Sequence, residues 1–150
     1  MTQNPGVDVD VDKLTRMLAA RMVSIVPPGF HVEADDGMLW YSAGDGRFPG
    51  QLGDYRVGRS GTFVRVNFEG YGQQDDDGIA AVAVLALGEL QDYVDEATHD
   101  PWPGLRGTPP RPYAQVRGHS LYLWYGRPDI KTGVSLTCEP IPLADLQRSV

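Results

Sequence analysis

The chain has 150 residues, of which 41% are hydrophobic, 20 are acidic and 13 are basic, so its formal net charge is −7. This composition fits one globular domain over residues 1–150 and excludes a disordered chain, and no apolar run reaches the roughly 20 residues of a membrane helix. The negative charge argues against a nucleic-acid partner, and the single cysteine excludes an internal disulfide, so we expect a cytoplasmic protein without a membrane partner.

A first helix is predicted over residues 10–26, because apolar residues recur there at spacings of three and four. These residues are Val11, Leu14, Leu18, Met22 and Ile25. Asp8, Asp10 and Asp12 surround its start, where carboxylates can cap free amide groups, and we interpret them as caps and not as metal ligands. Pro27-Pro28-Gly29 ends the helix, and residues 1–9 before it are expected to be flexible.

Three strands are predicted next. Residues 30–34 and 38–43 flank Asp35-Asp36-Gly37, and an Asp-Gly pair between such runs is a strong hairpin signal. Residues 44–61 contain six glycines and no apolar period, which predicts a long loop that is either functional or disordered. From Thr62 to Glu69 apolar and polar residues alternate, as in a strand with one buried face.

The longest apolar segment, residues 79–97, predicts a second helix that begins after three consecutive aspartates. Its first three turns are apolar almost all round, which implies burial on more than one side. A Pro-rich connector over residues 101–112 stops it. Strands over 113–117 and 120–125 form a second hairpin around Gly118-His119, and 133–141 supplies a sixth strand, whose prolines suggest a sheet edge.

The expected fold class is therefore α+β, in the order α-βββ-α-βββ, with one antiparallel sheet of about six strands and both helices packed on one face. One interpretation of the two halves is a pseudo-twofold repeat. Each helix ends at a proline-glycine stop and is followed by a hairpin whose second strand carries Leu39-Trp40-Tyr41 or Leu123-Trp124-Tyr125. The alternative is that aromatic residues simply suit strands.

Catalytic motifs are missing from the sequence: it contains no Gly-x-Ser-x-Gly elbow, no His-Glu-x-x-His helix and no Cys-x-x-Cys pair. Cys138 lies in an ordinary strand run and is expected to be a buried small hydrophobe. His31, Glu33 and Asp35 alternate as on a solvated strand face, which we favour over a metal site. We therefore predict no catalytic residue, no metal and no cofactor, and lean toward a protein that is not an enzyme.

An interaction surface is the leading functional hypothesis. Trp40 and Tyr41 point to opposite sides of their strand, as do Trp124 and Tyr125, so both faces of the expected sheet carry aromatic groups. Because two helices can cover only one face, the other exposes an apolar patch suited to a homodimer or to an adaptor for another protein. Alternatively, residues 44–61 and 101–112 fold over that patch.

The second helix also carries a segregated charge. From Glu69 to Asp100 there are nine acids and no base, and Glu89, Asp92, Asp95 and Glu96 cluster near the helix C-terminus. Negative charge is unfavourable there, and neighbours three or four residues apart repel. Two explanations are open: arginines of the first helix, Arg16 or Arg21, relieve the repulsion, or the acidic residues are a docking site for a basic partner.

A different class of function is a small-molecule or anion-binding enzyme with its site between residues 44–61 and 101–112. Arginine forks suit carboxylate and phosphate groups, and these two loops are rich in arginine. The candidate clamps are Arg47, Arg56, Arg59, Arg106 and Arg111. The simpler interpretation is that loop arginines aid the solubility of an acidic protein.

At Leu39-Trp40-Tyr41, residues 79–97, Asp100-Pro101-Trp102-Pro103 and residues 121–126, the chain resembles small actinobacterial proteins without an assigned function. Its 11 arginines against two lysines also resemble the products of GC-rich genomes. The resemblance implies a soluble cytoplasmic protein and carries over no catalytic or binding residue. The order of elements is also similar to type III secretion chaperone-like folds, which is an analogy of fold alone.

Overall fold

The structure, a computed structural model, describes residues 9–43, 62–66, 75–98, 101–103, 111–126 and 136–147. These residues form an α+β fold with two α-helices, α1 (Val11–Val23) and α3 (Asp76–Thr98). The first sheet contains β1 (Phe30–Asp35), β2 (Met38–Ala43) and β3 (Thr62–Arg65), in that order and all antiparallel. This part of the chain confirms the predicted class and the order of the first four elements.

The second sheet is also antiparallel and is built around β5 (Ser120–Gly126). On one side β5 pairs with β4 (Arg111–Arg117), and on the other with β6 (Leu136–Thr137) and β7 (Ile141–Pro142). A short 3₁₀ helix, η1 (Leu143–Leu146), follows β7. Arg111 and Pro112 therefore belong to a strand, although the sequence placed them in the Pro-rich connector.

The predicted sixth strand is divided into β6 and β7. Thr137 of β6 pairs with Trp124, and Ile141 of β7 pairs with Leu121. Four steps along this segment thus face three steps along β5, which is the geometry of a β-bulge. Pro140 lies within the bulge and has no amide hydrogen to donate to the ladder, so the interruption occurs at a residue that could not extend the pairing.

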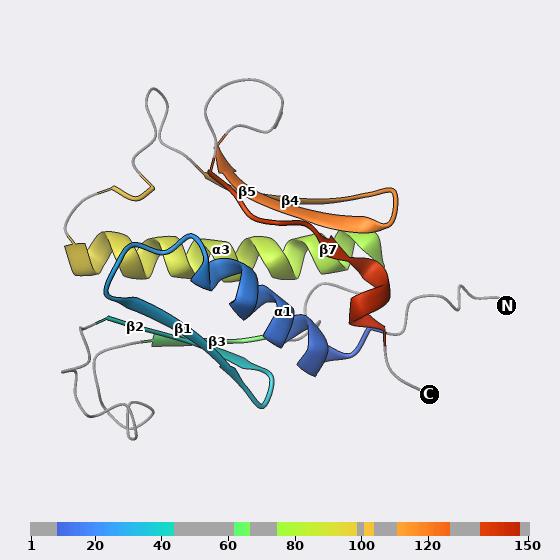
Figure 1. The fold of residues 1–150 in the computed structure, drawn as a ribbon, viewed down its shortest axis with the longest axis horizontal. Coiled ribbons are helices and arrows are strands. Elements are labelled where there is room, and N and C mark those ends of the chain that lie inside the picture. The colour runs from blue at the N-terminus through green and yellow to red at the C-terminus, as the bar shows by residue number, and fades with distance from the viewer. Residues whose placement is uncertain are drawn as a thin grey trace, which may run out of the picture.

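The prediction of one sheet with both helices on one face is wrong. The strands form separate sheets of three and four strands, and α3 lies between them (Figure 1). Helix α3 has 23 residues, and its buried residues span about half of its circumference, with half-buried apolar residues such as Ala81, Val84 and Leu85 beyond them. A helix that is apolar almost all round needs a cover on more than one side, and a second sheet supplies it.

Helix α1 begins and ends close to its predicted limits. Asp10 is the N-cap, and its carboxylate accepts hydrogen bonds from the amides of Asp12 at 2.9 Å and Lys13 at 3.2 Å. Asp12 lies in the first turn and pairs with Arg16. The predicted capping role is confirmed for Asp10, whereas Asp8 lies outside the described residues. The helix ends at Val23, three residues before the predicted limit.

Both hairpins turn through two residues. Asp36 and Gly37 have φ of 53° and 74°, the two positive values that a type I′ turn requires. In the second hairpin only Gly118 has a positive φ, 62°, which fits a type II′ turn. These turns match the right-handed twist of the strands, so the local sequence fixes the pairing of β1 with β2 and of β4 with β5.

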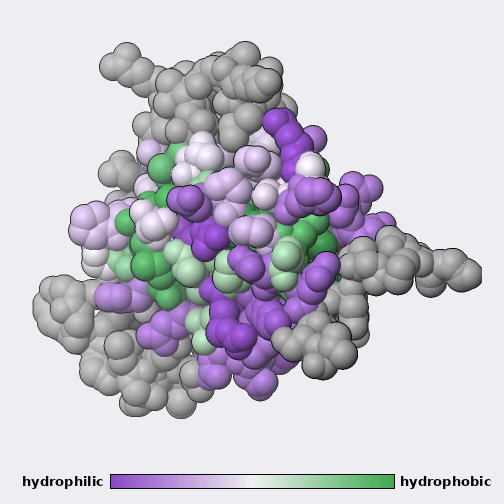
Figure 2. Space-filling view, turned by 45° about the vertical axis from the view of Figure 1, so that its right-hand side comes forward, coloured by the Kyte–Doolittle hydropathy of each residue, from purple (hydrophilic) through white to green (hydrophobic). Residues whose placement is uncertain are grey.

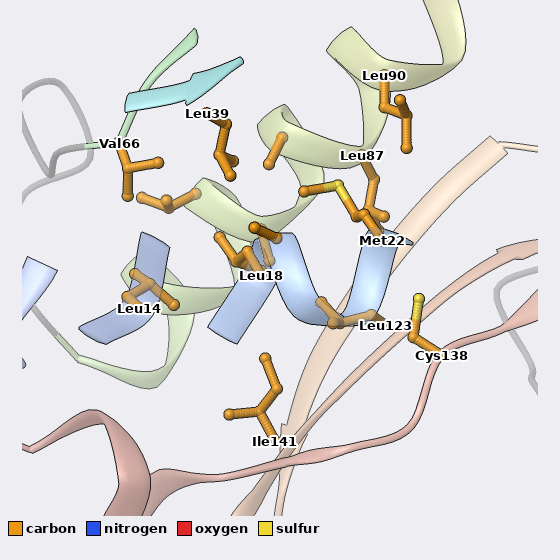
Figure 3. Packing of buried hydrophobic residues seen from close by; sticks show 14 of the residues in the cluster. Leu14, Leu18, Met22, Leu39, Val66, Leu87, Leu90, Leu123, Cys138 and Ile141 are labelled. Carbon is orange, nitrogen blue, oxygen red and sulfur yellow. The ribbon is translucent and has the colours of Figure 1, made fainter. Parts of the chain in front are cut away.

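One hydrophobic core joins all the layers. Leu14, Leu18 and Met22 of α1 are fully buried among side chains of α3 and of both sheets (Figure 3). Among the described residues, no helix is long and apolar enough to cross a membrane. Residues 44–61, most of 101–112 and most of 1–9 lie outside the described part of the chain, so the predictions made for them are not addressed.

Candidate functional site

The inward aromatic residue of each hairpin is fixed to the middle of α3. Tyr41 of β2 donates a hydrogen bond to the carbonyl oxygen of Ala86 at 2.8 Å, and Tyr125 of β5 donates one to that of Leu87 at 2.7 Å. Both tyrosines are fully buried. Each sheet thus donates one hydrogen bond to consecutive carbonyl groups of α3. Tyr41 and Tyr125, which the sequence predicted to be interaction residues, therefore stabilise the interior of the fold.

Burial raises the pKa of Tyr41 well above the ordinary value for tyrosine, and the negative charge of Glu89 raises it further. Burial likewise raises the pKa of Tyr125, with smaller contributions from Tyr41, Cys138, Asp95 and Asp92. Both hydroxyl groups therefore stay protonated at neutral pH and act as hydrogen-bond donors. A tyrosine that serves as a general base needs the opposite shift.

The outward aromatic residues are buried as well, with exposed fractions of 9% for Trp40 and 2% for Trp124. Trp40 contacts Phe63 of β3, with ring centroids 4.9 Å apart, and Trp124 stacks on Tyr113 of β4 at 5.7 Å. The expected patch of exposed indoles is therefore absent from the described strands. On these strands Phe63, which is 51% exposed, is the large apolar side chain that reaches solvent. The alternation of apolar and polar residues along its strand could have indicated this exposure, because it places Phe63 on the face opposite to Val64.

The acidic residues of α3 do not share one environment. Asp92 and Glu96 are exposed and Glu89 is half-buried, and their spacing of three and four places them on one side of the helix. Asp95 instead accepts a hydrogen bond from the amide of Trp102 at 2.6 Å and so fixes the chain that follows the helix. We define the acidic face as Glu89, Asp92 and Glu96.

Arginines of α1 do not neutralise the acidic face, so this prediction is wrong. Arg16 pairs with Asp12 of its own helix. Arg21 donates hydrogen bonds to the carbonyl oxygens of Glu139 at 2.9 Å and Pro140 at 3.0 Å, which join α1 to the segment before β7. Within the described ranges, no basic side chain lies within 4.0 Å of the acidic face.

Most of the arginines predicted to bind an anion lie outside the described part of the chain. Arg47, Arg56, Arg59 and Arg106 lie outside the described residues, and Arg111 is an exposed residue at the start of β4. A hollow at the tip of the first hairpin is lined by Val11, Asp12, Asp36, Gly37, Arg65 and Val66. Strand pairing sets Arg65 opposite Met38, and among the described residues no ion pair joins Arg65 to either aspartate of this hollow.

The described residues contain no group of three or more metal-ligating side chains, His31, Glu33 and Asp35 included. On the face shown in Figure 2, hydrophobic residues form small areas that are separated by polar ones. No family model, no curated protein and no solved structure matches the chain. The candidate site therefore rests on the acidic face, a charged surface without an ion-pair partner among the described side chains.

Cys138 is expected to be unreactive in the folded protein. It is 2% exposed, and burial raises the pKa of its thiol to about 11, although Arg21 acts in the opposite direction. Because the thiolate is the nucleophile, labelling by a disulfide reagent at pH 8 will be slow in buffer and fast in concentrated guanidinium chloride. Equal rates in the two conditions would contradict the burial.

Proposed function

We propose that the protein is a non-enzymatic interaction module that binds a basic partner protein through the acidic face of α3. The observation that carries this proposal is an acidic face near a helix C-terminus with no described cation within 4.0 Å. Such charges cost stability through the helix dipole and through mutual repulsion. Local folding energetics gives no reason for their presence, whereas a basic partner would offset both costs.

The position of the acidic face suits docking of a partner. It lies on the C-terminal half of α3, and Asp92 and Glu96 are exposed on successive turns of a helix whose buried side is fixed by Tyr41 and Tyr125. A rigid support keeps the entropy cost of binding low. Opposite charges along a partner helix or segment would speed the encounter and set its register.

A titration with a lysine- and arginine-rich peptide tests the proposal, with amide chemical shifts as the readout. We expect binding that weakens with salt and shifts centred on residues 89–96. Neutralisation by Asp92→Asn with Glu96→Gln should weaken binding roughly fivefold to thirtyfold, or about 1 to 2 kcal/mol.

The matched control is Glu139→Gln with Asp145→Asn, which makes the same charge change at exposed residues outside α3. It should leave the affinity within about twofold of the wild-type value, because the binding depends on local charge. If the two double variants lose affinity equally, net charge alone drives the binding and the proposal fails.

Neutralising the acidic face should also stabilise the folded protein. Glu89→Gln with Asp92→Asn is expected to raise the free energy of unfolding by about 0.5 to 1 kcal/mol at low salt, because it removes repulsion and an unfavourable dipole interaction. The gain should shrink in high salt. Denaturant unfolding measures it, and Asp12→Asn, which removes a carboxylate from a helix N-terminus, should have the opposite sign. A loss of stability in the double variant would reveal a stabilising partner for these charges within the chain.

We also propose that the two halves of the chain arose by duplication. It is supported by Tyr41 and Tyr125, which occupy equivalent positions of the two hairpins and donate to consecutive carbonyl groups of α3. It is supported further by the outward tryptophans, each of which contacts an aromatic residue on a neighbouring strand. We also propose a cytoplasmic location, for which a single buried free thiol is suited.

A further inference from the structure

The outer face of the second sheet is basic. Strand alternation places Arg111, Gln115 and Arg117 of β4 on this face, since Ala114 and Val116 pack against the core. All three polar side chains are exposed, and neither β4 nor β5 contains an acidic residue. We define the basic strand face as Arg111, Gln115, Arg117 and the adjacent Tyr122 of β5.

Neutral neighbours hold the guanidinium group of Arg117. Its Nε and Nη2 atoms donate to Oε1 of Gln115 at 3.3 and 3.2 Å, and its Cζ lies 5.8 Å from the centre of the Tyr122 ring. In the described part of the chain, no carboxylate lies within 4.0 Å of Arg111 or Arg117. The cation is thus held in place with donors left for an anionic group.

One end of the basic strand face lies near the acidic face. Helix α3 and strand β4 lie side by side, and a Cβ atom on Gly88 would lie 3.8 Å from Cγ of Pro112 (Figure 1). Gly88 immediately precedes Glu89, and Pro112 immediately follows Arg111. From this point β4 runs toward the start of α3, whereas the acidic face continues toward the helix C-terminus, so the two oppositely charged surfaces adjoin at the Arg111 end of β4 (Figure 1).

We propose that the basic partner is a second copy of this chain, in a twofold symmetric dimer where the acidic face of each copy lies on the basic strand face of the other. This inference rests on the proposed function and names the partner of the same site. A twofold interface must be self-complementary, and adjacent surfaces of opposite charge meet that requirement when one copy is turned over onto the other. Charge complementarity also disfavours unrelated acidic partners at the acidic face.

Charge reversal tests the dimer by sedimentation velocity on the full chain. One variant carries Arg111→Glu with Arg117→Glu, and the other carries Asp92→Lys with Glu96→Lys. Each variant alone sets like charges against each other at both contacts, so its dimer dissociation constant should rise roughly a hundredfold or more. An equimolar mixture restores opposite charges at both contacts and should form a one-to-one dimer.

A wild-type dimer, two monomeric variants and a dimeric mixture support the inference. A monomeric wild-type chain at low salt, a variant that still dimerises, or a mixture that stays monomeric overturns it. Milder variants, Arg111→Gln with Arg117→Gln and Asp92→Asn with Glu96→Gln, should weaken the dimer by a smaller factor, and circular dichroism checks that every variant is folded. If the wild-type chain is monomeric but binds the basic peptide at α3, the dimer is wrong while the proposed function stands.

Discussion

Replacing Leu18 with alanine is expected to lower the free energy of unfolding by about 2 to 5 kcal/mol, the cost of deleting a buried leucine side chain and leaving a cavity. Leu18 is fully buried in α1, and side chains from α3 and both sheets surround it (Figure 3). No single layer can move inward to fill the space without loosening its contacts with another layer. Denaturant unfolding followed by circular dichroism measures the loss.

Val23→Ala is the matched control for this substitution. Val23 is the last residue of the same helix and is 52% exposed, so its truncation should change the stability by no more than about 0.5 kcal/mol. Similar losses in the two variants would mean that α1 does not pack against α3 and the two sheets as described.

The folded protein should lose stability steeply at alkaline pH because of Tyr41 and Tyr125. Their pKa values are raised in the folded state, so the folded chain holds these protons more tightly than the unfolded chain does. The resulting stability is complete below the ordinary tyrosine pKa of about 10 and is lost as pH rises above it. Each tyrosine should cost about 1.4 kcal/mol per pH unit in that range.

Tyr41→Phe with Tyr125→Phe separates this titration from the hydrogen bonds. At pH 7 the double variant should be less stable by about 1 to 3 kcal/mol, because two hydrogen bonds are lost. Above pH 10 its stability should fall less steeply than that of the wild type, apart from the fall due to the Cys138 thiol, whose pKa is raised to about 11. Urea titrations from pH 8 to pH 11.5 measure both slopes, and parallel slopes would contradict the burial of the two hydroxyl groups.

Much of the secondary structure could be predicted from the sequence, because its signals are local. The Asp10 cap, the Asp36-Gly37 turn and the apolar spacing of α1 act within a few residues, and each is confirmed. Helix α3 is confirmed within a few residues at each end. The Pro140 signal was also physical, since the residue lies in a bulge of the segment that forms one edge of the second sheet as described.

The candidate site depended on pairings that no local pattern encodes. The sequence indicated an acidic surface on the second helix, but the positions of Arg16 and Arg21 depend on which elements pack against α1. Spacing along a strand likewise indicated that Trp40 and Tyr41 face opposite sides of the sheet, but it did not indicate that both side chains are buried. The sequence did not single out Arg117 as a candidate site residue, because its fixed position depends on the contacts with Gln115 and Tyr122 beside it.

The sequence by itself determined the class, the order of the elements as far as β5 and the hairpin registers, since hydrophobic period and turn chemistry operate between near neighbours. Only the tertiary structure decided that the strands divide into two sheets with α3 between them. The first turns of α3 are apolar almost all round and required burial on more than one side. This pattern did not indicate which element would cover the second side. Burial is non-directional and proportional to area, so a helix accepts any apolar cover, and long-range packing of the whole chain makes the choice.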